Sequence, residues 1–132
     1  MSEKDLGKLC ATLSPVVAEG TYVYCCFPDF TLPTGLPAFC IVRERDGLTA
    51  IIERDEALRR GLAYTYDARL ITLSVHSSLE AVGLIALISR KLAEAGISCN
   101  VIAGYYHDHI LVPVNRADDA MTLLLEIASP AR

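Results

Sequence analysis

The chain has 132 residues, of which 52% are hydrophobic and 21% are charged, and this composition fits one compact unit while excluding intrinsic disorder. The formal net charge is -4 with scattered Lys and Arg, which excludes nucleic-acid binding as an expected function because such binding depends largely on neutralising phosphates. No apolar run is long enough to span a membrane and the first residues do not resemble a signal peptide, so we expect a cytoplasmic protein.

Residue patterns in the first half predict an opening helix followed by strands and a proline-rich loop. The expected elements are a helix over residues 2–13, strands over 21–27, 38–45 and 48–53, a helix over 54–60 and a weaker strand over 62–66. Residues 28–37 contain three prolines and Gly35, which predicts a loop. Asp46-Gly47 predicts a tight hairpin turn whose two central residues have positive φ. Gly61 is expected to cap the helix before it.

The second half has clearer periodicity. The expected elements are a strand over residues 69–76, a helix over 81–95, strands over 97–105 and 109–114, and a helix over 116–128. Gly96 is expected to end the first helix, with Ile97 packing back on Leu92. Asn115 is expected to cap the second helix.

The two halves follow nearly the same plan. The second reads β-α-β-β-α, and the first reads β-loop-β-β-α-β. We therefore predict an N-terminal half over residues 1–67, with the leading helix, and a C-terminal half over 68–132, each a split βαβ unit. The second half lacks a fourth strand. A strand of the first half or of a neighbouring subunit completes that sheet edge, or the edge stays open.

The junction from His76 to Gly83 is the first candidate site. It leads into the N-terminus of the best predicted helix, where free backbone N–H groups and the helix dipole favour an anion. Ser77 and Ser78 add donors, and Gly83 leaves room for a ligand. A carboxylate fits better than a phosphate because no basic residue is nearby. The alternative is that Ser77 and Glu80 form a capping box and only close the helix.

Residues around this junction resemble the ACT domain, a small amino-acid-binding regulatory module. Gly83-Leu84-Ile85 is followed by Leu92-Ala93-Glu94-Ala95-Gly96-Ile97, and Glu80 falls where the family has an acidic residue. Val82 stands where the family usually has proline. The resemblance covers about residues 69 to 128.

Two longer segments extend the resemblance. Ile71 to Gly83 and Cys99 to His109 resemble short bacterial proteins built from two ACT-like halves without an enzyme domain. The resemblance implies an α+β class with a ferredoxin-like ACT fold, in which two tandem halves have antiparallel sheets and helices on one face.

The resemblance also implies a function. The chain is expected to bind a free amino acid or similar small carboxylate as a regulatory or sensor protein, to form a homodimer, and to be no enzyme. The implied ligand contacts are Ser77, Ser78, Leu79, Ala81, Val82, Gly83, Asn100 and Ile102. His76 is a further candidate contact, which either meets the ligand or faces solvent at the end of its strand. Ser77 and Ser78 would donate to the α-carboxylate, and Asn100 would take the ammonium or side chain. The alternative function is a ligand-free interaction module that assembles with a metabolic enzyme.

Tyr105-Tyr106-His107-Asp108-His109 is a second candidate site. It is a polar hairpin turn, an additional ligand or interface contact through Tyr106, His107 and His109, or a metal site. The metal alternative lacks ligands, because the only other histidine is His76. We expect neither a metal nor a cofactor.

Covalent chemistry has little support in the sequence. Adjacent residues such as His76 and Ser77 do not easily reach the geometry of a catalytic triad, and no nucleophile-elbow motif is present. The five cysteines form no CxxC pair. Cys25 and Cys26 are neighbours in a predicted strand and so point to opposite faces.

Overall fold

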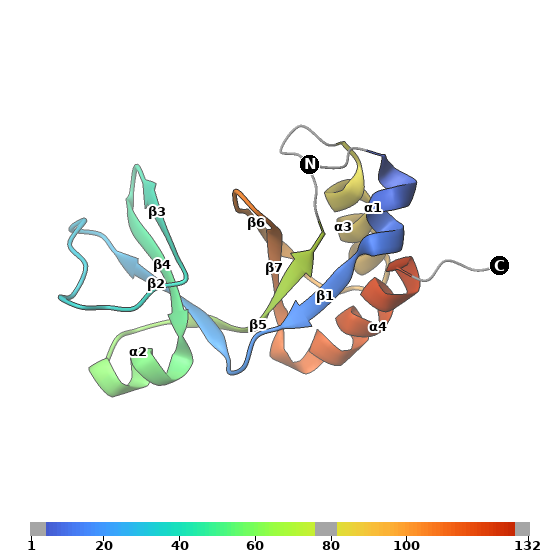
Figure 1. Ribbon diagram of the computed structural model, residues 1–132. Helices are drawn as coiled ribbons and strands as arrows, with labels where there is room; N and C mark the ends of the chain where they lie inside the picture. Colours follow the sequence, from blue (N-terminus) through green and yellow to red (C-terminus); the bar gives the residue numbers. More distant parts are fainter. Residues whose placement is uncertain (1–4, 76–81, 129–132) are drawn as a thin grey trace. The chain divides into compact units, whose positions relative to one another are not determined.

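The computed structural model describes residues 5–75 and 82–128 and divides into two compact units (Figure 1). Unit 1 combines Met1–Ala18 with Arg69–Arg132, and unit 2 is Glu19–Ala68. Packing thus groups the N-terminal segment with the second half of the chain. The predicted boundary between the two sequence halves at residue 67 concerns the order of the chain and not its packing, and it stays a prediction.

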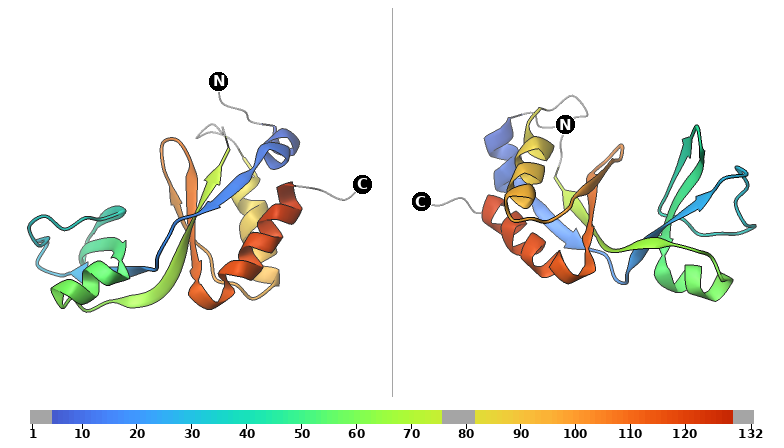
Figure 2. Two further views of the ribbon diagram at one scale, coloured as in Figure 1. Left: turned by 60° about the horizontal axis from the view of Figure 1, so that its bottom comes forward. Right: turned by 180° about the vertical axis from the view of Figure 1, so that it is seen from behind.

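Unit 1 is a sheet with one helical face. Its strands follow the order β1-β5-β7-β6, and Figures 1 and 2 show the helices gathered on one side of them. The described elements are α1 (Leu6–Thr12), β1 (Ser14–Val17), β5 (Thr65–Ser74), α3 (Leu84–Glu94), β6 (Asn100–Ala103), β7 (Asp108–Pro113), the 3-10 turn η1 (Val114–Arg116) and α4 (Ala117–Ala128). This order is the split βαβ plan, with β1 in the place of the fourth strand.

Strand β1 was not predicted, and it completes the sheet edge that the sequence left open. Ser14 lies opposite Ser74 and Val17 lies opposite Ile71 in an antiparallel ladder. The Ala18 N–H extends this pairing by donating to the Leu70 carbonyl at 2.9 Å. Pro15 is tolerated because β1 is an edge strand, where one side of the backbone needs no partner. The fourth strand therefore comes from the N-terminal segment, one of the three predicted alternatives.

The core of unit 1 joins all three helices to the sheet. Helix α3 buries Leu84, Ile88 and Leu92, which lie on one face as the helical periodicity predicted. Leu9 of α1 is fully buried in the same cluster. The other buried members are Leu13, Ile71, Leu73, Val75, Ile97, Ile110, Val112, Ala117, Ala120 and Leu124.

Helix boundaries in the second half differ from the predictions at the N-terminal ends. Helix α3 begins at Leu84 rather than at residue 81, because Gly83 takes the N-cap position with a left-handed φ of 111°. Its end agrees with the prediction: the Ile97 N–H donates to the Leu92 carbonyl at 2.9 Å. Asn115 lies inside η1 rather than capping α4, which begins at Ala117.

The two strands predicted over residues 62–66 and 69–76 are one strand, β5. Tyr66 has a positive φ of 68°, and the pairing of β5 with β2 (Tyr22–Phe27) changes register at this point. A local irregularity of the backbone therefore joins the two predicted segments without ending the strand. Strand β6 is shorter than predicted, at Asn100–Ala103.

Unit 2 is built on β2, to which β4 (Gly47–Glu53) and then β3 (Cys40–Glu44) are added in antiparallel pairing. Helix α2 (Arg54–Arg60) lies against one face of these strands (Figure 2) and ends at Gly61, whose φ is 66° as predicted. The buried core residues are Val23, Cys25, Ala50, Ile52 and Ala57.

The β3–β4 turn has a different geometry from the predicted one. Glu44 pairs with Gly47, so the central residues are Arg45 and Asp46, and neither has a positive φ. Gly47 is required for a different reason. A Cβ at this position would lie 3.0 Å from both the Phe27 oxygen and the Pro28 Cα. The glycine therefore allows two backbone segments to approach closely.

The proline-rich loop of unit 2 is fastened to α2. Arg60 donates from its two terminal guanidinium nitrogens to the Thr34 and Gly35 carbonyls, each at 3.1 Å. Glu56 is buried and accepts from Arg59 and from Arg60. These hydrogen bonds, that of Arg60 first, lower the pKa of Glu56 against the opposing effect of desolvation. Glu56 therefore holds Arg60 in position on the loop.

We expect Glu56→Gln to weaken the pH dependence of stability. Because the pKa of Glu56 is lowered in the folded state, its contribution is present above the unfolded value of about 4.3 and is lost as the pH falls through the folded value. Urea unfolding at neutral and acidic pH should show the variant less stable near neutrality, with the difference shrinking in acid. Asp55→Asn, which changes an exposed carboxylate on the same helix, is the control. A constant difference between wild type and Glu56→Gln across the pH range would contradict the prediction.

Candidate functional site

Part of the predicted ligand set lies outside the described residues. These positions are His76, Ser77, Ser78, Leu79 and Ala81, together with Glu80 of the alternative capping box. The described chain stops at Val75, which is buried at the end of β5, and resumes at Val82, which is 84% exposed.

Val82 and Gly83 lead directly into α3. The Gly83 carbonyl accepts the first helical hydrogen bond from the Leu87 N–H at 2.9 Å. A Cβ on Gly83 would lie 3.4 Å from Leu6 Cδ2, so a side chain of α1 occupies the space beside this glycine. The N-terminal N–H groups of α3 remain the donors that the predicted anion site would use.

Asn100 and Ile102 lie on the edge strand β6. Val101, between them, pairs with Ile110, which belongs to the core under the helices. Because successive side chains alternate between faces, Asn100 and Ile102 lie on the face away from the helices. The structure therefore places these two predicted contacts on a different layer of unit 1 from Gly83.

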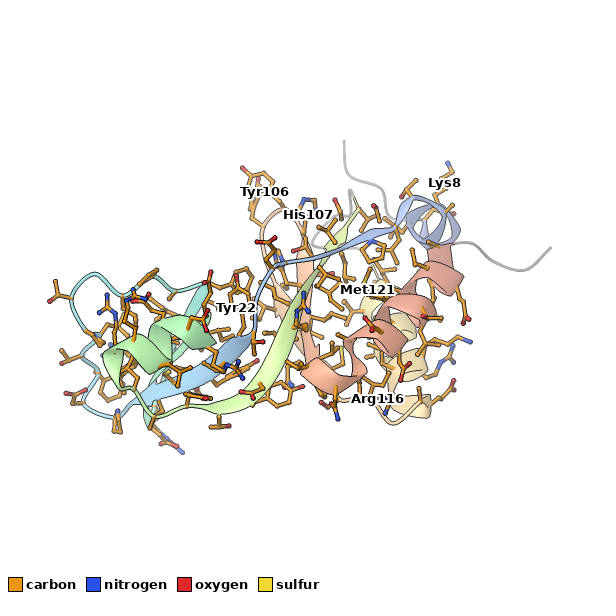
Figure 3. All side chains as sticks on the ribbon, turned by 90° about the horizontal axis from the view of Figure 1, so that it is seen from below. Lys8, Tyr22, Tyr106, His107, Arg116 and Met121 are labelled. Atoms are coloured by element: carbon orange, nitrogen blue, oxygen red, sulfur yellow. The ribbon has the colours of Figure 1, made fainter. Side chains whose placement is uncertain are left out.

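A groove opens at the end of β5 where the described chain reaches Val75. Its volume is about 740 Å³. We name it the Lys8 groove, and it is lined by Lys8, Ala11, Thr12, Ser14, Ser74, Val75 and His107. Its walls thus come from α1, β1, β5 and the β6–β7 turn, which lie at the same end of unit 1 (Figures 1 and 3).

His107 lines this groove and also has a buried polar atom. Its Nδ1 atom is buried and has no hydrogen-bond partner among the described residues. The main chain of His107 is fixed, because its carbonyl accepts from the Gly104 N–H at 2.9 Å. A buried nitrogen without a partner is uncommon and often marks a place where water or a ligand binds.

The neighbouring His109 has a structural partner instead. Its Nδ1 atom lies 2.9 Å from the Thr72 hydroxyl on β5, within hydrogen-bonding distance. Burial lowers the pKa of His109, and nearby His107 lowers it further, while Asp108 opposes both effects. Burial raises the pKa of Asp108, against the smaller effects of the two histidines. The predicted trio is thus divided, with His107 at the groove and His109 bonded across the sheet.

The chemical alternatives gain no support from the described geometry. Within residues 5–75 and 82–128, no group of three or more His, Cys, Asp or Glu side chains is arranged to hold a metal ion. The serines and the histidine considered for a triad, Ser77, Ser78 and His76, lie outside these ranges.

The cysteines are free thiols. Cys25 is buried and Cys26 is exposed, as predicted for neighbours that point to opposite faces of a strand. Burial raises the pKa of the Cys10, Cys25 and Cys99 thiols, which disfavours the reactive thiolate. Among the described residues, no helix combines the length and the apolar character needed to cross a membrane.

Sequence reasoning missed most of the groove. Lys8, Thr12 and Ser14 were assigned to a leading helix and its end, far in the chain from Ser74 and His107. No motif connects these positions. They meet only because β1 pairs with the end of β5, with Ser14 opposite Ser74.

Family models support the resemblance seen in the sequence. One ACT domain model matches residues 1–69, and a second ACT domain model matches residues 65–126. Both the resemblance and the tandem arrangement are therefore confirmed. No curated protein matches the chain.

Solved structures with the same fold include a protein of unknown function and regulatory domains of aspartate kinase. A Vibrio cholerae protein of unknown function, described as a possible transport protein, is 44% identical with a TM-score of 0.83, covering 95% of this chain and 97% of its own. An Agrobacterium tumefaciens protein is 17% identical with a TM-score of 0.74, covering 88% and 89%. A C-terminal regulatory domain of aspartate kinase from Porphyromonas gingivalis is 14% identical with a TM-score of 0.63, covering 91% and 99%. The last two show the fold alone, and the predicted α+β ferredoxin-like class with two tandem halves is confirmed.

Proposed function

We propose that this chain, which belongs to the ACT domain family, is a regulatory protein. Its ligand is a free amino acid or a similar small carboxylate. Both matched models are ACT domains, so a regulatory, ligand-binding role follows from the family in general terms. The identity of the ligand as an amino acid and the absence of catalysis are parts of the proposal.

The observation that carries this proposal is the position of the Lys8 groove. It opens at Ser74 and Val75, the last described residues before the loop that the family resemblance assigns to the ligand. Among the described residues of its lining are hydroxyls, an ammonium and an imidazole, which are groups that can bind a small polar anion. Two residues of the groove, Ser74 and Val75, therefore directly precede the predicted ligand loop in the sequence.

Within this proposal, Ser77 and Ser78 donate to the α-carboxylate together with the first N–H groups of α3. Asn100 binds the ammonium or the side chain of the ligand, with Ile102 beside it. In this arrangement β6 of one copy of the chain lies near the ligand of a second copy. This last role needs a homodimer, because Asn100 lies on the edge strand and on the face away from Gly83. The dimer and a cytoplasmic location are likewise proposals.

Titration calorimetry of the full chain against the twenty amino acids tests the function. We expect at least one amino acid to bind more tightly than about 1 mM, which corresponds to about -4.1 kcal/mol. Ser77→Ala with Ser78→Ala should weaken that ligand about tenfold, because two donors to a charged group are lost. Ser89→Ala, on the exposed side of α3, is the matched control.

The outcome that would contradict the proposal is saturation by none of the twenty amino acids at millimolar concentration. The interaction-module alternative would then be tested by affinity capture. It requires one metabolic enzyme to be recovered in fixed stoichiometry, with an activity that no amino acid alters. Regulation of such an enzyme by an amino acid would instead support the proposed role.

A further inference from the structure

We infer that strand β3 is a contact between two copies of this chain, which pair antiparallel along its open edge with Val42 on the two-fold axis. Strand β3 ends the order of strands in the sheet, and among the described residues only β4 pairs with it (Figure 1). An open edge presents backbone groups that readily accept another strand. The inference goes beyond the proposed function, because it assigns a surface to the dimer and does not depend on a ligand.

The backbone groups available at this edge follow from the β3–β4 turn. Glu44 pairs with Gly47 across a two-residue turn, and such a closing pair exchanges its backbone hydrogen bonds. Hydrogen-bonded and non-hydrogen-bonded pairs alternate along an antiparallel ladder, so the backbone of Val42 also bonds to β4. The N–H and C=O groups of Ile41 and Arg43 therefore point away from β4, toward the open edge.

These outward groups select one register for a second copy. With Ile41 of one copy opposite Arg43 of the other, every outward N–H and C=O group of both copies is used. Arg43 opposite Arg43 would instead place like charges face to face, which is destabilising. Ile41 opposite Ile41 would need the Phe39 N–H, which already donates to the Ile51 carbonyl at 2.8 Å. The favoured register therefore places Val42 opposite itself.

Exposed apolar side chains are concentrated at the same edge. Four of the five exposed large hydrophobic residues of unit 2 lie on β3 or beside it. Ile41 is 48% exposed and Val42 is 44% exposed, on opposite faces of the strand. The other two are Phe39, which directly precedes β3, and Phe30, whose ring centroid lies 4.8 Å from Arg43 Cζ. Pairing with a second copy therefore buries apolar surface on both faces of the strand.

The charged side chains of β3 do not block this pairing. The Arg43 guanidinium lies over the Phe30 ring, and Glu44 accepts a hydrogen bond from the Thr49 hydroxyl of β4. Both charges are thus held against their own unit. Edge strands are commonly protected by a proline or a bulge, but β3 contains no proline and pairs with β4 in continuous register. In the favoured register, neither charged side chain lies opposite a like charge.

Equilibrium sedimentation of the full chain tests this interface. We expect a homodimer whose dissociation constant rises at least about tenfold in Val42→Lys, because two like charges would lie directly opposite each other. Val42→Glu should have the same effect. An equimolar mixture of the two variants should recover a dimer, because opposite charges then meet across the axis. This recovery separates a lost contact from a lost fold, which thermal melting of each variant also checks.

Cross-linking tests the register. Val42→Cys should form an intermolecular disulfide on mild oxidation, because opposed residues of a non-hydrogen-bonded pair have Cα atoms about 4.5 Å apart, which a disulfide can span. Leu58→Cys is the control for the free cysteines already in the chain, because Leu58 is 58% exposed on α2, away from the edge. Val16→Lys is the matched control for the charge variants, since Val16 is 53% exposed on the edge strand β1.

The inference is overturned if the wild-type chain is monomeric throughout the micromolar range, or if Val42→Lys remains fully dimeric. It is also overturned if the two folded charge variants do not associate when mixed. Dissociation by Val16→Lys in place of Val42→Lys would move the contact to β1. Calorimetry that detects no amino-acid binding would overturn the proposed function and leave this interface unaffected.

Discussion

Replacing Leu9 by alanine is expected to lower the free energy of unfolding by about 2–5 kcal/mol, the range typical of a buried leucine. Leu9 is fully buried in α1 and packs in the core of unit 1 with residues from α3, α4 and the sheet. Truncation removes apolar contacts and leaves a cavity that well-packed neighbours only partly fill. Urea unfolding followed by circular dichroism measures the change.

Leu6→Ala is the control for this substitution. Leu6 lies on the same helix but is 38% exposed, so we expect it to cost less than about 1 kcal/mol. Amide hydrogen exchange then tests which part of the chain α1 stabilises. In Leu9→Ala, protection should fall in α3 and α4, while β2, β3 and β4 of unit 2 keep theirs. Loss of protection confined to unit 2 would show that the N-terminal segment packs with the first half instead.

Gly104→Ala should disturb the turn that holds His107. A Cβ at this position would lie only 2.9 Å from the His107 carbonyl oxygen and 3.4 Å from His109 Nε2. The backbone must shift to relieve this contact, and the hydrogen bond from the Gly104 N–H to that oxygen weakens as a result. We expect a loss of about 1–3 kcal/mol in the free energy of unfolding, the usual range for an overpacked site.

The same substitution should shift the main chain of His107, because the His107 carbonyl is held by the Gly104 N–H in this turn. Gly20→Ala is the comparison. Gly20 has a φ of 84° but nothing within 4 Å of its added Cβ, so the variant has conformational strain without a clash. Unchanged stability in Gly104→Ala would show that the turn adapts freely to the added Cβ.

Periodic segments were predicted accurately because their signals are local. Helix α2 has the predicted bounds, since a charged surface and Gly61 mark its extent. Helix α3 buries Leu84, Ile88 and Leu92 at helical spacing, although its start is shifted to Leu84. Errors occurred where a residue's usual role was overridden by its surroundings. Gly47 was assigned to the turn, but it is required by the close approach of the Phe27 and Pro28 backbone.

The candidate site also has one part that local sequence signals predict and one part that only the structure shows. The β5–α3 junction is a prediction from the sequence, because its serines and glycine are close together in the chain and precede a strongly periodic helix. The Lys8 groove was not, because Lys8 and His107 are far apart in the sequence and share no motif. Strand β1 was also missed, since four residues that include a proline carry almost no strand signal.

The amino-acid sequence by itself determined the α+β class and the two tandem split βαβ halves, because these follow from local periodicity. Its resemblance to the ACT domain implies the stretch in which a ligand is expected. Only the tertiary structure decided that the N-terminal segment supplies the fourth strand of the second sheet. That pairing provides hydrogen-bond partners for the exposed edge of β5. The sequence alone does not specify which strand does so, because an open edge can pair with any strand of suitable length. It also decided which side chains surround the groove, because strand register sets Ser14 opposite Ser74 and carries α1 to the end of β5.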